Sequence, residues 1–132
     1  MIAGEVENLT GLRPRSVLIA EDDPGISRMM KLVLEDEGFA VTIARDGAEA
    51  LALVGSMNPD VLLLDLRLPV LNGEEVASKI RGLPDGARPK VLVTSASSRL
   101  KEISEQIGAD GFVQKPFELD DLIAATQQAF AK

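Results

Sequence analysis

Five polar residues that could act together stand at or directly after short apolar runs, and they are Glu21, Asp22, Asp65, Thr94 and Lys115. Three of them are carboxylates, which repel one another at close range unless a cation neutralises them. Carboxylate oxygens in a chain without histidine or cysteine favour Mg²⁺, or alternatively Mn²⁺, over zinc. A metal ion, a lysine and a hydroxyl around a carboxylate can stabilise phosphoryl transfer. We therefore predict that Asp65, the central carboxylate, is a nucleophile that forms an aspartyl phosphate.

Each of these residues also has a purely structural interpretation. The acidic run 21–23 favours the positive end of a following helix, and for Asp23 this is the larger part of the expected role. An aspartate directly after a strand, such as Asp65, is often only a cap. Thr94 can be an ordinary β-branched strand residue, and Lys115 can be a solvated surface charge. The functional interpretation therefore requires that all of them meet at one edge of the fold.

Apolar runs predict the strands that would bring these residues together. The five runs cover residues 17–20, 40–44, 61–64, 91–93 and 112–113. The third run does not alternate with polar residues, as expected for a strand covered on both faces of its sheet. A helical pattern follows each run; the first helix is expected to begin after Asp23 at Pro24, and the second to end at Gly55. This alternation predicts an α/β fold, a doubly wound parallel sheet with five helices on its two faces.

The predicted sheet also predicts where a ligand would bind. In open α/β sheets, ligands bind beyond the carboxyl ends of the strands, and the five polar residues stand at those ends. Residues 16–132 are expected to form this single domain. Residues 1–15 contain Gly4, Gly11 and Pro14 without an apolar period, which predicts a flexible N-terminal extension.

Composition excludes several classes of chemistry and of partner. The chain has 132 residues, with 21 Asp and Glu against 14 Lys and Arg, and therefore a formal net charge of −7. It contains no cysteine and no histidine, which excludes disulfides, thiolate chemistry and histidine-based catalysis. An acidic chain repels phosphate, so direct nucleic-acid binding is not expected. The apolar runs are too short to span a bilayer, and residues 1–10 lack the pattern of a signal peptide, so a cytoplasmic location without membrane attachment is expected.

Other phosphate-handling motifs do not fit this sequence. It lacks both the G-x-x-x-x-G-K-[ST] loop and the G-x-G-x-x-G fingerprint. A flavin site would need a hydroxyl-rich loop where this chain has the acidic run 21–23. A dehalogenase-type phosphatase would need Asp-x-Asp, whereas this chain has Asp65-Leu66-Arg67 and lacks the second acid. A metal-dependent phosphatase is therefore disfavoured.

Residues 16–131 resemble a known family, the receiver domain of two-component response regulators. The matching segments are Val17 to Asp22, Pro59 to Asp65, Leu68-Pro69, Asn72-Gly73, Val91 to Thr94, Gly108 to Phe112 and Lys115-Pro116-Phe117. Each segment alone is a weak signal, and the whole set in this order is highly specific. The resemblance implies a flavodoxin-like sheet with the strand order 2-1-3-4-5, similar to stand-alone chemotaxis regulators.

The resemblance also implies a role for each matching position of the acidic site. Asp65 would be the phosphoacceptor. Mg²⁺ would be bound by Asp65, by Asp22 directly, by Glu21 chiefly through water, and by the backbone carbonyl of Arg67. Lys115 would pair with Asp65 and then with its phosphoryl group.

Two further residues would form the switch that the resemblance implies. Thr94 would move to the phosphoryl oxygen, and Phe112 would turn inward behind it. This rearrangement would alter the surface formed by the fourth helix, the fifth strand and the fifth helix, which would bind a downstream target protein. The phosphoryl donor would be a sensor histidine kinase or a phosphotransfer protein. The domain would be a phosphoacceptor switch, and not an enzyme beyond its own phosphoryl transfer and autodephosphorylation.

Three departures from the family pattern bear on these expectations. Ser95 stands where the family mostly has alanine, and Arg67 occupies a position that tunes the attacking water. The last helix, from Glu118, has no basic residue before Lys132, which argues against a dimer held by salt bridges on that face. A stand-alone phosphorylatable receiver is favoured, and the alternative is a receiver-like interaction module that acts without phosphorylation.

Overall fold

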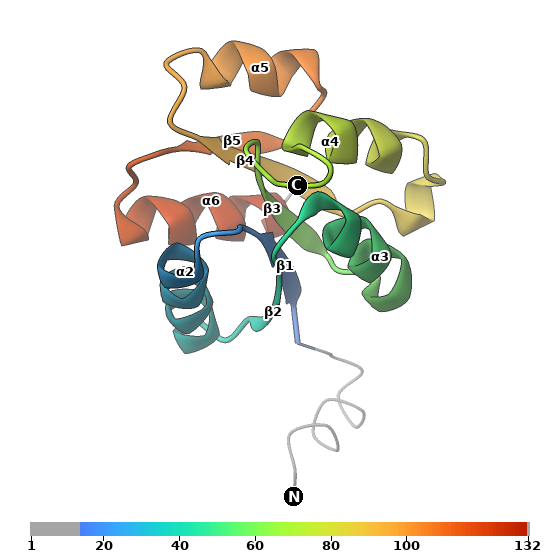
Figure 1. Cartoon of the computed structure of the whole chain (residues 1–132). Helices are drawn as coiled ribbons and strands as arrows, with labels where there is room; N and C mark the ends of the chain where they lie inside the picture. Colours follow the sequence, from blue (N-terminus) through green and yellow to red (C-terminus); the bar gives the residue numbers. More distant parts are fainter. Residues whose placement is uncertain (1–13, 132) are drawn as a thin grey trace, which may run out of the picture.

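The protein, described over residues 14–131 by a computed structural model, is built around a parallel β-sheet (Figure 1). Its five strands lie in the order β2-β1-β3-β4-β5. The strands are β1 (Ser16–Ala20), β2 (Ala40–Ala44), β3 (Val61–Asp65), β4 (Lys90–Ser95) and β5 (Gly111–Gln114). The predicted fold and strand order are therefore confirmed.

Five α-helices cover the two faces of the sheet. They are α2 (Pro24–Asp36), α3 (Gly47–Met57), α4 (Gly73–Arg81), α5 (Leu100–Gln106) and α6 (Leu119–Ala131), with a short 3₁₀ helix at Asp85–Ala87. Helices α2 and α6 pack on one face, and α3, α4 and α5 pack on the other (Figure 1). Within β1, Leu18 and Ala20 belong to one of the two resulting cores, and Val17 and Ile19 to the other. Both faces of each central strand are buried, which explains the apolar runs without alternation.

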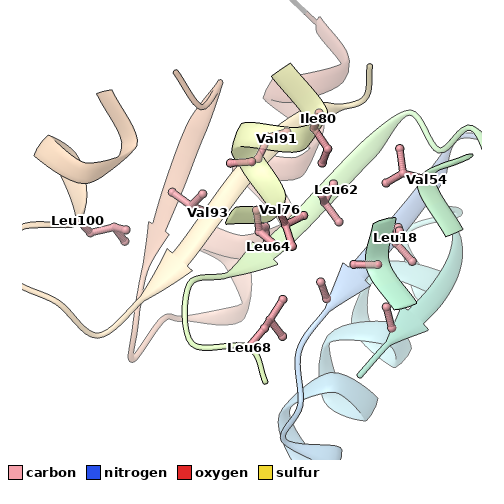
Figure 2. Packing of buried hydrophobic residues seen from close by; sticks show 14 residues of the cluster. Leu18, Val54, Leu62, Leu64, Leu68, Val76, Ile80, Val91, Val93 and Leu100 are labelled. Atoms are coloured by element: carbon pink, nitrogen blue, oxygen red, sulfur yellow. The ribbon is translucent and has the colours of Figure 1, made fainter. Parts of the chain in front are cut away.

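The core beneath α3, α4 and α5 supports the site from behind (Figure 2). Leu62 and Leu64 of β3 point into it, and the same cluster contains Val76 of α4 and Leu100 of α5. All four side chains are buried. Because Leu64 directly precedes Asp65, this packing fixes the backbone from which the predicted nucleophile projects.

Side-chain caps begin three of the helices, and one predicted helix end is wrong. The Asp23 side chain accepts a hydrogen bond from the Ile26 N–H at 2.8 Å, as expected for the start of α2. Helix α3, however, continues through Gly55 to Met57 and ends at Asn58, whose φ of 53° is left-handed. Glycine is favoured at helix ends because it adopts the left-handed conformation readily, and at the end of α3 an asparagine adopts that conformation.

The N-terminal extension predicted for residues 1–15 lies almost entirely outside the described residues. At its end, the Arg15 guanidinium lies 5.2 Å from the centre of the Phe130 ring. Phe130 in turn stacks on Phe39, with ring centres 5.4 Å apart. Arg15 thus packs against the end of α6. Within residues 14–131, none of the helices has the length and apolar character that crossing a lipid bilayer requires.

Candidate functional site

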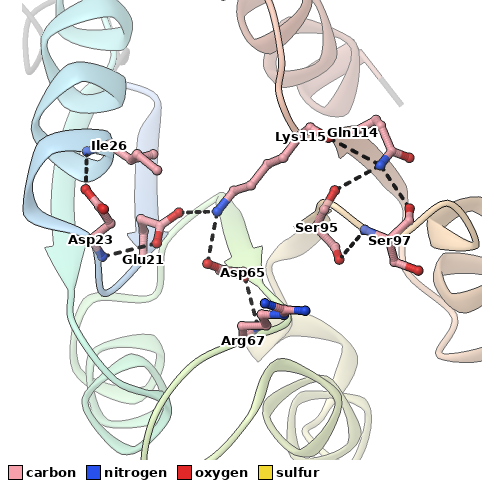
Figure 3. Close-up of polar contacts among 9 residues, drawn as sticks. All are labelled: Glu21, Asp23, Ile26, Asp65, Arg67, Ser95, Ser97, Gln114 and Lys115. Carbon is pink, nitrogen blue, oxygen red and sulfur yellow. Dashed lines mark hydrogen bonds and ion pairs between the residues drawn. The ribbon is translucent and has the colours of Figure 1, made fainter.

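The carboxyl ends of β1, β3, β4 and β5 bring the predicted residues together. Figure 3 shows Glu21, Asp65 and Lys115 among them. Glu21 directly follows β1, and Asp65 is the last residue of β3. Thr94 in β4 is the register partner of Asp65, and Lys115 directly follows β5. Glu21, Asp65 and Thr94 are buried. The requirement that these groups share one edge of the sheet is met.

Lys115 connects the carboxylates of two different strands. Its Nζ donates to Glu21 Oε1 at 2.5 Å and to Asp65 Oδ2 at 3.0 Å (Figure 3). The remaining oxygens of both carboxylates are also engaged: Glu21 Oε2 accepts from the Asp23 N–H at 3.2 Å, and Asp65 Oδ1 accepts from the Arg67 N–H at 2.8 Å. Both carboxylates are therefore held in fixed orientations by residues that follow β1, β3 and β5.

Burial and these contacts shift the pKa of two groups in the site. Burial raises the pKa of Glu21 above its ordinary value of 4.5; the hydrogen bonds from Lys115 and Asp23 lower it only in part, and the charge of Asp65 raises it further. Burial alone would lower the pKa of Lys115, but its hydrogen bonds to Glu21 and Asp65 outweigh this and raise that pKa. Lys115 is therefore protonated, whereas burial destabilises the ionised form of Glu21.

The acidic side chains fit a hard divalent cation. Glu21, Asp22 and Asp65 each offer a carboxylate oxygen, and these oxygens lie within 4.8 Å of one another. Asp22 is exposed, so the cluster opens to solvent on that side. With Lys115 counted, three negative charges meet one positive charge. Oxygen donors, an unbalanced negative charge and an open side match the requirements of Mg²⁺, which retains several waters when bound to protein.

The two predicted switch residues, Thr94 and Phe112, lie on the neighbouring strands β4 and β5. Thr94 is buried beside Asp65 in the sheet. Phe112 of β5 is 40% exposed and therefore lies in an outward position. Arg67 is exposed, and its backbone N–H contacts Asp65.

Two close contacts near Asp65 were missed by reasoning from the sequence. A Cβ added to Gly73 would lie 2.6 Å from the Asp65 carbonyl oxygen, so only glycine allows α4 to begin this close to the site. In the loop between β3 and α4, the Leu71 N–H donates to the Pro69 carbonyl at 2.8 Å across Val70, whose φ is 70°. A β-branched residue in this conformation is strained. Asn72-Gly73 was one of the segments on which the family resemblance rested, but nothing in the sequence pattern indicated either contact.

Another contact missed at the sequence level lies next to Lys115. The side chain of Gln114 donates hydrogen bonds to carbonyl oxygens of the loop after β4 (Figure 3). A glutamine at the end of a strand carries no pattern that would have indicated this.

Comparison with protein families matches residues 17–127 to the response regulator receiver domain. The chain is 37% identical over 109 residues to the DNA-binding response regulator MtrA of Mycolicibacterium smegmatis, covering 82% of this chain and 47% of that protein. It is 38% identical over 114 residues to the uncharacterized transcriptional regulatory protein YkoG of Bacillus subtilis, covering 86% of this chain and 50% of that protein. The chain thus spans about half the length of the curated relatives it matches.

Solved structures show the same similarity. A putative response regulator from Chloroflexus aurantiacus superposes with a TM-score of 0.84 at 29% identity, covering 91% of this chain and 100% of that one. The chemotaxis response regulator CheY4 of Vibrio cholerae has a TM-score of 0.82 at 28% identity, covering 89% and 99%. The receiver domain of the sensor histidine kinase PA1611 from Pseudomonas aeruginosa has a TM-score of 0.81 at 28% identity, covering 91% and 100%; that structure has a magnesium ion coordinated in its active-site cleft.

Proposed function

The chain belongs to the response regulator receiver domain family, and on that premise we propose that Asp65 accepts the phosphoryl group. Receiver domains of two-component signalling are phosphoacceptor switches and not enzymes of the ordinary kind. The observation that carries the assignment to Asp65 is its contact with Lys115 at 3.0 Å within a buried acidic cluster. An interaction module that acts without phosphorylation is not favoured, because Glu21, Asp65, Thr94 and Lys115 are all present and meet at one edge.

The transfer that we propose balances as a simple displacement. A carboxylate oxygen of Asp65 attacks phosphorus, forming the P–O bond of an acyl phosphate while the P–N bond of a phosphohistidine breaks. The imidazole nitrogen that leaves takes a proton from the donor protein or from solvent. This chain has no histidine, so the donor is another molecule, either a sensor histidine kinase or a phosphotransfer protein.

Residues around Asp65 stabilise the charge on the transferred group. Lys115 already lies beside Asp65, and its ammonium can pass from the carboxylate to a phosphoryl oxygen. The Thr94 hydroxyl donates to a second phosphoryl oxygen. Hydrolysis by water attack on phosphorus regenerates Asp65, and Arg67 would affect that water, as the resemblance to the family implies. The chain would thereby catalyse its own dephosphorylation.

Mg²⁺, or Mn²⁺ in its place, is the cofactor that the acidic cluster would hold. Asp65 and the exposed Asp22 would supply direct carboxylate ligands, and Arg67 its backbone carbonyl. Glu21 would act chiefly through water, as the resemblance to the receiver family implies. When bound, the cation supplies positive charge to the phosphoryl oxygens.

The output is a change in a surface next to the site. Phe112 lies outward in β5, and its inward rotation behind a displaced Thr94 would alter the surface formed by α5, β5 and α6. We propose this surface as the docking site of a downstream target protein, with no direct contact to nucleic acid. Helix α6 contains no Lys or Arg, so a dimer held by salt bridges from that helix is not expected.

Phosphorus NMR tests the proposed chemistry. The protein is incubated with Mg²⁺ and phosphoramidate, and an acyl-phosphate resonance is expected that disappears on addition of hydroxylamine. Asp65→Asn should show no such resonance. Asp46→Asn, which removes a carboxylate charge at the start of α3 and keeps a capping side chain, is the matched control and should behave as the wild type. An acyl phosphate that persists in Asp65→Asn would contradict the assignment.

A further inference from the structure

Gln114 ties the loop that follows Thr94 to the strand that carries Lys115. Its side-chain Nε2 donates to the Ser97 carbonyl at 2.9 Å and to the Ser95 carbonyl at 3.2 Å, and it lies 3.4 Å from the Lys115 carbonyl (Figure 3). Ser95 is the residue after Thr94, and Gln114 is the residue before Lys115. One side chain therefore links the segments that bear two groups of the proposed chemistry.

The linked segment, residues 95–99, is held together by two hydrogen bonds of its own. The Ser97 N–H donates to Ser95 Oγ at 3.0 Å, and the Arg99 N–H donates to Ser97 Oγ at 3.1 Å. The Lys115 N–H also donates to the Ser95 carbonyl at 2.8 Å, which continues the pairing of β4 with β5. Gln114 adds the link further along, at Ser97, where the loop has left the sheet and leads into α5.

Helix α5, which follows the loop, begins at the buried Leu100 and has no side-chain cap. It has seven residues, and its N-cap residue, Arg99, makes no capping hydrogen bond with its side chain. The Leu100 N–H donates to the same Ser97 carbonyl, at 3.3 Å, that accepts from Gln114. The Gln114 amide therefore shares its acceptor, the Ser97 carbonyl, with the first residue of α5.

We propose that Gln114 is a positioning residue that holds loop 95–99 in the resting arrangement and so opposes the movement of Thr94 toward a phosphoryl group on Asp65. This inference rests on the proposed function. A displacement of the Thr94 backbone moves the carbonyl of the next residue, Ser95, relative to the Gln114 amide. Contacts that exist only in the resting state weight the population toward that state. Phe112, on the same strand, lies outward, as the resting arrangement requires.

The chemistry of the amide suggests two informative substitutions. An amide nitrogen offers two hydrogens, one for each carbonyl oxygen. Gln114→Met keeps the length of the side chain and removes both donors. Gln114→Glu replaces the donors with a carboxylate that only accepts, and so repels both carbonyls. Gln114 is exposed, so neither change opens a cavity in the core.

The experiment compares wild type, Gln114→Met and Gln114→Glu by amide NMR, with Gln127→Met on the exposed side of α6 as the control. Each protein is titrated with Mg²⁺ alone and then with beryllofluoride, which mimics a phosphoryl group on a carboxylate. We expect Mg²⁺ affinity to stay at the wild-type value in all four. Beryllofluoride affinity should rise about three- to tenfold in both Gln114 variants, as expected for losing one to two partly exposed hydrogen bonds from the resting state only. Before beryllofluoride is added, the loop resonances of Gln114→Met should already lie part of the way toward their bound positions.

Unchanged beryllofluoride affinity in both Gln114 variants would overturn the proposal, and so would a weaker affinity, since Gln114 would then support the phosphorylated arrangement. If the wild type itself takes up neither beryllofluoride nor a phosphoryl group, the proposed function fails. In that event amide hydrogen exchange of the metal-free proteins still decides the role of Gln114. The amides of Ser97, Arg99 and Leu100 should exchange faster in Gln114→Met than in wild type, and equal rates would overturn the proposal.

Discussion

Lys115 Nζ lies 3.0 Å from Asp65 Oδ2, and the two residues are 50 positions apart in the sequence. The same ammonium group lies 2.5 Å from Glu21 Oε1, so one cation serves two buried carboxylates. Asp22 adds a third negative charge that no lysine balances within this cluster. The metal-free site is therefore arranged to attract a cation, and this excess of negative charge determines how substitutions should affect stability.

Removing the charge of Asp65 should stabilise the metal-free protein. In Asp65→Asn, the pair between Glu21 and Lys115 can persist while one of the repelling charges is lost. We expect the free energy of unfolding in urea, measured in EDTA, to rise by about 1 kcal/mol. Added Mg²⁺ should raise the free energy of unfolding less in this variant than in wild type, because the Asp65 carboxylate is no longer available as a metal ligand. Lower stability of Asp65→Asn in EDTA would contradict the description of a crowded acidic site.

Removing the positive charge of Lys115 should destabilise the metal-free protein. Lys115→Met leaves Glu21 and Asp65 buried without their common partner. We expect a loss of about 2 kcal/mol in EDTA, less than for a fully enclosed ion pair because the cluster is open at Asp22. Added Mg²⁺ should recover part of the loss, as measured by urea unfolding. Lys79→Met on the exposed side of α4 is the control, and a loss of the same size there would remove the support for a specific role of Lys115.

The raised pKa of Glu21 makes a signed prediction for pH. Its pKa in the folded protein lies above 4.5, chiefly because of burial, so folding favours the protonated form. The stability that this group contributes is fully present below about pH 4.5 and is lost as the pH rises through the folded-state pKa. In EDTA, Glu21→Gln should therefore gain stability relative to wild type between about pH 4 and pH 7. Urea unfolding at several pH values checks this. A stability of Glu21→Gln that falls relative to wild type as the pH rises would refute it.

Gly73 should be intolerant of even one added methyl group. The Cβ of Gly73→Ala would lie 2.6 Å from the carbonyl oxygen of Asp65 and 2.6 Å from Leu66 Cα, and both neighbours are backbone atoms. We expect a loss of more than about 2 kcal/mol in thermal or urea unfolding. Gly55→Ala, in α3 with open space around the added Cβ, is the matched control and should gain about 0.5–1 kcal/mol. Equal effects of the two changes would contradict the close approach of α4 to Asp65.

Much of the fold could be predicted because its signals are local. The apolar run of β3 and the cap residue Asp23 report their structures through neighbouring residues alone, and both were predicted correctly. The shared edge of Glu21, Asp65, Thr94 and Lys115 followed from the general rule for parallel sheets.

What the sequence could not show depends on contacts between distant segments. The left-handed φ of Val70 and the close approach of Gly73 to Asp65 arise from how the loop between β3 and α4 packs. Gly55 was read as a helix end because glycine favours that position, whereas packing continues α3 to Met57. The hydrogen bonds of Gln114 to Ser95 and Ser97 follow from the register of β4 with β5.

The mass of the intact protein after incubation with Mg²⁺ and phosphoramidate tests the central claim, phosphorylation of Asp65, most directly. One added phosphoryl group is predicted for wild type and for Asp46→Asn, and none for Asp65→Asn or for wild type in EDTA. Rapid hydrolysis is controlled by a parallel measurement of beryllofluoride binding. An unmodified wild-type protein that binds Mg²⁺ but not beryllofluoride would contradict the claim, and so would a phosphoryl group on Asp65→Asn.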